Sequence, residues 1–197
     1  MRRPPSHRLG GGGAPSGGVG VALRLAWVGC VLAAVFAMRG GVLALTLAPM
    51  TLEQLTGSAA LVVRARCIDR GVTRDADGRI TSLARFAVVA RAKGEAPEVV
   101  TVRQLGGRSG DTELVVPGAP LSEPGDDVVL FLEPRDDGTH GVVGLALGYL
   151  PVIVMPGTGA AVRTSRTLGG VFADGGVHPV DELLSRVREI AAAEATR

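Results

Sequence analysis

Short apolar segments, separated by turn-forming residues at intervals of about 8–12 positions, are the feature of this sequence that most restricts its fold. Roughly six to eight such segments follow residue 59. Several of them mix continuous apolar runs with alternating apolar and polar residues, as strands do when one face lies in a core. They do not alternate with helical segments, so a doubly wound parallel sheet is not expected. The pattern predicts a mainly β fold, either a small antiparallel barrel or a sandwich.

The clearest strand segments are ALVVRARCID (60–69), ITSLARFAVVARA (80–92), VVTVR (99–103) and VVLFLE (128–133). The turn signal DADG (75–78) joins the first two, which we expect to form a long antiparallel pair. Further strands are expected at Glu113–Val116, Val142–Leu147 and Leu150–Met155, and PGTG (156–159) predicts a hairpin into Ala160–Arg163. Aromatic residues make up only 3% of the chain, so aliphatic side chains must fill the core.

Two helices are expected at the ends of this domain. Thr51 is a suitable N-cap for the first, and Gln54 stands at the third helical position of a capping box. The second is the amphipathic segment DELLSRVREIAA (181–192), whose apolar stripe is formed by Leu183, Leu184, Val187, Ile190 and Ala191. We therefore expect a β-barrel domain at 50–155, with a hairpin and the C-terminal helix at 156–197 packed on it. Recognition of the helix by a groove on a partner is the alternative.

Residues 1–44 have the composition of an export signal. Four arginines, with no acidic residue, precede thirteen uncharged residues, LAWVGCVLAAVFA (25–37), and VLA follows at 42–44. A basic stretch, an apolar run of about 7–15 residues and small residues at its end are the parts of a secretory signal. Arg39 interrupts the run before the length of about 20 apolar residues that a bilayer span needs. We expect a periplasmic or extracellular protein; an uncleaved anchor, stretched from Val19 to Leu47, is the alternative.

Removal of this leader reverses the charge of the chain. The whole sequence has 21 Lys and Arg residues against 19 Asp and Glu, a net charge of +2. Five of the basic residues and none of the acidic ones lie in residues 1–44, which leaves 16 basic and 19 acidic residues, a net charge of −3. No basic patch with interleaved aromatic residues occurs either. We therefore expect no nucleic-acid partner, and contact with a membrane only through the leader.

The sequence contains few residues that could act as reactive thiols or metal ligands. Cys67 lies in an apolar strand-like run and is interpreted as a small buried side chain, with a reactive or intermolecular thiol as the alternative. His140 and His178 lie far apart, without other ligands at metal-site spacing. The acidic turns at 75–78 and 136–138 begin like calcium loops but lack the terminal glutamate, and hairpin turns explain them. We predict no metal and no cofactor.

The glycine-rich stretch LGGRSGD (105–111) resembles a catalytic turn. Ser109 stands where a nucleophile elbow, G-x-S-x-G, places its serine, and Asp137 and His140 follow in the chain order of a hydrolase triad. Asp111 replaces the last glycine, however, and the helix that the elbow requires is not expected after it. A phosphate-binding loop is excluded because it needs a Gly-Lys-Ser/Thr ending that opens a helix. We assign no catalytic residue and interpret the stretch as an exposed strand exit, suited to contacts at a barrel rim.

The order of these segments supports a family resemblance. It runs TLEQL, ALVVRARC, ARAKGEAP, VVTVRQLGG, PGDDVVLFLEP and VVGLALGYLPV. This order resembles a group of exported bacterial single-domain proteins of unassigned function, which carry an A-D-x-V-V-x-G strand, an lKG turn and a G-E-x-V-V-L-F-L strand. More remotely, the layout is similar to the OB-fold barrels of the netrin and metalloproteinase-inhibitor type, which implies an OB-like barrel.

The chain departs from these patterns at identifiable positions. Ser58-Ala59-Ala60 stands where the group has Ala-Asp, and Arg64-Ala65 stands where its first strand has glycine. Inhibitors of the netrin-like type act through a disulfide-tethered cysteine at the mature N-terminus, and no cysteine occurs near residue 45 of this chain. Protease inhibition is therefore not carried over.

Three functions stay open from the sequence. The first is an exported, non-catalytic β-barrel module that binds an unknown protein or another envelope or extracellular component. The second is a hydrolase with an unrecognised site, for which Ser109, Asp137 and His140 are the candidates. The third is an envelope subunit tethered to the membrane by an uncleaved N-terminal helix.

Overall fold

The computed structural model describes residues 49–196, apart from 75–76, 158, 165–167 and 170–174. The leader predicted at 1–44 lies outside the described residues, as do residues 75–76 of the predicted turn at 75–78. Strands make up 51% of the structure and helices 20%, which confirms a mainly β fold. In the described part of the chain, none of the helices combines the length and the apolar character that crossing a membrane requires.

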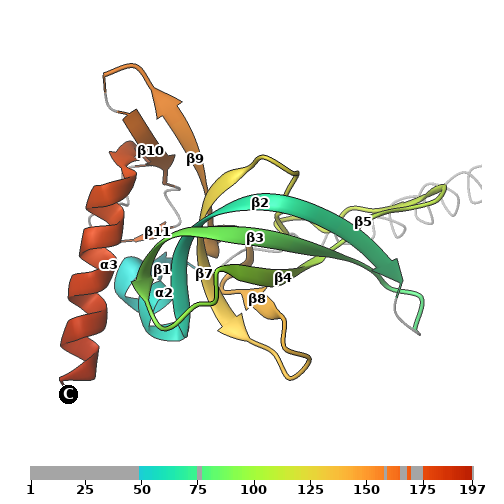
Figure 1. The fold of residues 1–197 in the computed structure, drawn as a ribbon, viewed down its shortest axis with the longest axis horizontal. Coiled ribbons are helices and arrows are strands. Elements are labelled where there is room, and N and C mark those ends of the chain that lie inside the picture. The colour runs from blue at the N-terminus through green and yellow to red at the C-terminus, as the bar shows by residue number, and fades with distance from the viewer. Residues whose placement is uncertain (1–48, 75–76, 158, 165–167, 170–174, 197) are drawn as a thin grey trace, which may run out of the picture. The chain divides into compact units, whose positions relative to one another are not determined.

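Five strands close into a barrel (Figure 1). They are β2 (Leu61–Arg74), β3 (Ile80–Lys93), β4 (Val99–Leu105), β7 (Asp127–Pro134) and β8 (His140–Val142). Their order is β7-β2-β3-β4-β8, and a β7–β8 pairing closes the ring. The predicted barrel is therefore confirmed, and the long β2–β3 hairpin forms as expected.

One contact of the otherwise antiparallel barrel is parallel. β8 runs antiparallel to β7 but parallel to β4, where His140 lies opposite Val102. A ring with an odd number of strands cannot alternate direction at every contact, so at least one neighbouring pair must be parallel. The short β8 meets this requirement with a single bridge to β4.

The interior of the barrel is an aliphatic core with one aromatic ring. Alternate residues of the strands point inward, as the period of two requires. The fully buried members are Leu61, Val63, Ala65, Cys67, Ala84, Phe86, Val100, Val102, Val128, Leu130 and Leu132. Cys67 is thus a buried side chain inside the barrel, and burial raises the pKa of its thiol. This agrees with its interpretation as a small apolar residue.

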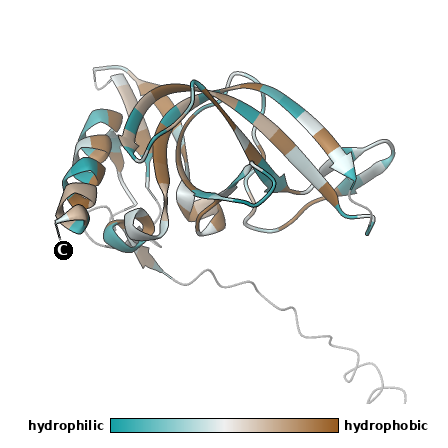
Figure 2. Cartoon of the chain, turned by 60° about the horizontal axis from the view of Figure 1, so that its bottom comes forward, coloured by the Kyte–Doolittle hydropathy of each residue, from teal (hydrophilic) through white to brown (hydrophobic). Residues whose placement is uncertain are grey.

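A second core lies outside the barrel, where β2 and β7 pair. Val62, Val129 and Phe131 point away from the barrel interior and are fully buried under helix α2 (Leu52–Ser58) and helix α3 (Val180–Ala195). Figure 2 shows long apolar stretches on the barrel strands, and alternating hydrophilic and hydrophobic residues along α3. The part of β7 at 128–132, VVLFL, is continuously apolar because both of its faces are covered. Helix α3 thus packs on the outer face of the barrel strands β2 and β7.

Local interactions set the position of the two helices. Thr51 and Gln54 exchange hydrogen bonds of 3.2 and 2.9 Å, so the predicted capping box at the start of α2 is present. At its other end, Lys93 Nζ of β3 donates to the carbonyl oxygen of Thr56 at 2.7 Å and pairs with Glu194 of α3 at 3.0 Å. One ammonium group therefore links both helices to the barrel.

The remaining strands extend the sheet beyond the barrel. β9 (Tyr149–Met155) pairs with β7, followed by β10 (Gly159–Arg163) and β12 (Val177–Pro179), and the predicted hairpin at PGTG is confirmed. A separate parallel pair joins β1 (Met50–Thr51) to β11 (Leu168–Gly169). The prediction of a strand at Val142–Leu147 is wrong. Gly144 and Leu145 have φ values of 63° and 54°, and this left-handed turn leads into a 3-10 helix, η1 (Leu145–Gly148).

Truncation of a side chain in the outer core tests whether helix docking contributes to stability. Leu183 of α3 is fully buried. We expect Leu183→Ala to lower the free energy of unfolding by about 2–5 kcal/mol, since it removes buried methyl groups and leaves a cavity. Urea denaturation measures the change. Glu182→Ala, at the exposed neighbouring position, is the control and should change stability little; equal effects of both variants would contradict the described docking.

Candidate functional site

A pocket of about 580 Å³ lies at one rim of the barrel, where four chain segments meet. We call it the rim pocket. It is lined by Arg79, Ile80 and Thr81 at the start of β3, Arg103 and Leu105 at the end of β4, Leu114 and Val116 at the end of the next hairpin, and Arg135 and Asp137 of the β7–β8 turn. Loops that a rigid scaffold positions commonly carry binding residues. The rim pocket is therefore the candidate functional site.

The glycine-rich stretch (105–111) contributes Leu105 to this pocket and leads to Leu114 and Val116. It folds as a hairpin of β5 (Gly107–Ser109) and β6 (Thr112–Leu114). Gly106 has a φ of 94°, and a Cβ there would lie 2.5 Å from the carbonyl oxygen of Leu114. The buried hydroxyl of Ser82 also donates to the carbonyl oxygen of Gly106 at 2.8 Å. The glycines therefore allow a close backbone crossing that brings Leu114 to the rim.

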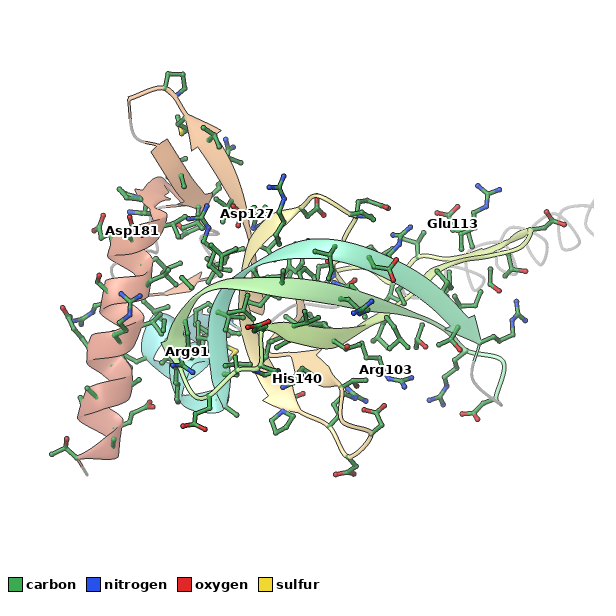
Figure 3. All side chains as sticks on the ribbon, in the orientation of Figure 1. Arg91, Arg103, Glu113, Asp127, His140 and Asp181 are labelled. Atoms are coloured by element: carbon green, nitrogen blue, oxygen red, sulfur yellow. The ribbon has the colours of Figure 1, made fainter. Side chains whose placement is uncertain are left out.

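An ion pair connects β4 to the β7–β8 turn inside the pocket. Arg103 Nη2 lies 2.8 Å from Asp137 Oδ2, and the other carboxylate oxygen accepts from the hydroxyl and the backbone N–H of Thr139. Figure 3 shows the side chain of Arg103 below β4, on the side of this turn. The Thr139 hydrogen bonds, with help from Arg103, lower the pKa of Asp137 to about 2. Asp137 is thus a charged, fully engaged carboxylate.

The three residues named for hydrolysis do not form a catalytic unit. Ser109 ends β5 and enters a two-residue turn, so the strand-to-helix geometry of a nucleophile elbow is absent at this position. Asp137 accepts from Thr139 and Arg103, while the buried Nδ1 of His140 has no hydrogen-bond partner within the described residues. A triad needs the carboxylate on that nitrogen. The structure brings Asp137 and His140 into one turn without coupling them.

Metal ligands do not gather anywhere in the described ranges. No group of three or more His, Cys, Asp or Glu side chains is placed to hold an ion there. The acidic segment 136–138 forms a hairpin turn between β7 and β8 rather than a metal-binding loop. Gly138 has a φ of 77°, and the N–H of Arg135 donates to the carbonyl oxygen of Thr139 at 2.9 Å across the turn.

A buried polar network, which the sequence pattern did not indicate, ties the 117–126 segment to the barrel. Gln104 of β4 donates to the hydroxyl of Ser122 at 2.7 Å and accepts from its backbone N–H at 3.1 Å. Ser122 donates in turn to the hydroxyl of Tyr149 at 3.1 Å, and Tyr149 donates to Asp126 at 3.4 Å. Burial raises the pKa of Tyr149 to about 12. This network holds the 117–126 segment against β4 and β9.

In comparisons with known proteins, the sequence matches no protein-family model and no curated protein.

The pKa of Asp137 provides a first test of the rim pocket. The folded carboxyl titrates near 2 against an ordinary value of 3.8. Its contribution to stability is therefore present above about pH 3.8 and is lost as the pH falls through 2. We expect Thr139→Val to raise this pKa toward 3.8, and Arg103→Gln to raise it less, since the Thr139 bonds are the larger cause. Carboxyl ¹³C NMR follows the titration; an unchanged midpoint in Thr139→Val would contradict the described turn.

Tyr149 allows a second test because it is the only tyrosine in the chain. Absorbance at alkaline pH should show a single phenol that ionises near pH 12, against 10.0 for an exposed one. Between these values the unfolded chain releases a proton that the folded chain keeps, so stability is full below pH 10.0 and falls toward pH 12. Tyr149→Phe should abolish this pH dependence in denaturation experiments. A midpoint near 10 in the folded protein would show that the phenol is not buried.

Proposed function

We propose that this protein is an exported, non-catalytic β-barrel module, and that its rim pocket binds an anionic partner of the envelope or the extracellular space. The observation that carries this proposal is the composition of the pocket wall. Three arginines and one aspartate line it, beside four aliphatic side chains. A guanidinium group binds a carboxylate through two parallel hydrogen bonds, which gives both affinity and orientation.

The charges of the pocket support an anionic ligand. Asp137 is the one acidic residue of the pocket wall, and Thr139 and Arg103 occupy its oxygens. Arg79 is 77% exposed, and its one ion pair among the described residues is a long contact of 3.8 Å with Asp77. Arg135 is exposed too. The pocket is therefore locally positive in a mature chain whose net charge we derive as −3, and this contrast favours attraction of a negative group to this place.

The apolar side of the pocket restricts the ligand further. Leu105 is 47% exposed and Leu114 is 38% exposed, and Val116 lies beside them. Covering these three side chains removes apolar surface from water and adds to the binding free energy. The ligand obtains this contribution only if it has an aliphatic group next to its anionic group. An acidic residue beside an aliphatic one in a polypeptide has this chemistry. The wall contains no aromatic residue among those described, whereas single-stranded nucleic acid binds by stacking on aromatic rings.

The sequence of the leader supports the compartment. Its basic stretch, uncharged run and small residues favour export and removal of residues 1–44. The mass of the protein recovered from the envelope or the medium tests this part of the proposal. A mature chain that starts near residue 45 agrees with export, and a retained N-terminus would favour the tethered form.

A dipeptide titration tests the ligand chemistry. We expect N-acetyl-Glu-Leu-amide to shift the amide NMR signals of residues around the rim pocket, while the Gln-Leu analogue does so at least about tenfold more weakly, since it lacks the charge. The double variant Arg79→Gln with Arg135→Gln should lose the difference between the two dipeptides. Arg85→Gln, at an exposed position of β3 outside the pocket, is the control. Equal binding of both dipeptides, or shifts confined to other surfaces, would overturn the assignment.

A further inference from the structure

Strand β9 has one edge that the described part of the structure leaves open. Its first residues, Tyr149–Pro151, pair with β7 on one side. Its last residues, Val152–Met155, pair with β10 on the other side only. Figure 1 shows this part of β9 extending away from the barrel together with β10. Backbone N–H and C=O groups on such an edge are a template for another strand.

This edge lacks the features that normally protect an exposed strand. The segment VIVM (152–155) contains no charge, proline or glycine. Val154 is 86% exposed, a higher fraction than any other large hydrophobic residue of the described chain, and Met155 is 37% exposed. Charged side chains, prolines or bulges usually prevent edge pairing. Their absence from these four residues favours pairing with a further strand.

Two pockets flank the edge, one on each face of β9. Val152 and Val154 line a pocket of about 590 Å³ that also includes Arg66 of β2. Ile153, which points to the opposite face, lines an apolar pocket of about 330 Å³ together with Leu147 and Arg163. An added strand places successive side chains on opposite faces. The side chains on each face of an added strand would therefore have a pocket to enter.

Each face of β9 carries an arginine. In the first pocket, Asp127 is held by Arg64 through bonds of 3.1 and 2.7 Å, and Asp126 accepts from the N–H of Glu123 and from Tyr149. Arg66 and Arg163 have no ion pair with any residue that the structure describes. A strand beside β9 therefore meets a guanidinium group on each face of the sheet, and complementary carboxylates on that strand would pair with these groups.

We propose that the Val152–Met155 edge of β9 accepts an extended segment of a partner polypeptide, with aliphatic residues and flanking carboxylates, as an additional β-strand. Main-chain hydrogen bonds provide the attachment, and the two pockets with Arg66 and Arg163 select the side chains. The site shares no residue with the rim pocket, so each can be tested without the other.

Hydrogen exchange with a synthetic strand tests this proposal. The probe is a short peptide of alternating Val and Thr with a glutamate at each end, and its backbone N-methylated form cannot pair. We expect the first peptide to protect alternate amides of Val152–Met155 and the second to protect none. Val154→Glu should weaken binding about fivefold or more, through loss of a cross-strand contact and added like charge. Val89→Glu is the control, because Val89 is 58% exposed and lies on β3, away from the edge.

The other outcomes contradict the proposal in distinct ways. Protection that appears without peptide and rises with protein concentration assigns the edge to a second copy of this chain. Equal protection by the N-methylated peptide excludes strand addition, and equal binding of a glutamine-ended peptide excludes the charge selection. No protection at any peptide concentration overturns the site. A Val154→Glu variant that unfolds in parallel denaturation experiments is replaced by Val154→Thr, for which a smaller loss of affinity is expected.

Discussion

The pairing of β2 with β7 is the interaction on which the rest of the structure depends. Val63 and Leu130 of this pair face the barrel interior, while Val62 and Phe131 face α2 and α3, so two cores share one two-stranded ribbon. A change in register by one residue would exchange the two sets of side chains, since strand residues alternate between faces. Both cores therefore specify the same register, and the barrel and its helices form one cooperative unit.

Closure of the ring then determines where a binding site can form. With five strands, one contact must be parallel, and the short β8 supplies it after a tight turn from β7. That turn carries Arg135 and Asp137 to the end of β4, where Arg103 meets them. The rim pocket is thus a consequence of the way in which the barrel closes.

Much of this fold could be predicted because it depends on local patterns. The capping box at Thr51, the C-terminal apolar stripe and the most apolar strand all follow from periodicity and residue type, and the structure contains each of them. The parallel contact of His140 and the left-handed turn at Gly144 could not be predicted, since both depend on how distant segments meet. The candidate site was missed for the same reason, because its arginines come from three separate strand ends. Only the interpretation of the glycine-rich stretch as a contact surface directed attention to this rim of the barrel.

The single lysine of the chain gives the domain an unusual chemical property. Lys93 lies between three elements, with its ammonium group bonded to the end of α2 and to Glu194 near the end of α3. Reagents that acylate amines therefore find one side-chain target in the whole sequence, and it is occupied while both helices are docked. The rate of acylation at this residue reports helix undocking directly, without any introduced label. In an amine-reactive surface coupling, Lys93 is likewise the one side-chain point of attachment, and docking of both helices makes it scarcely available.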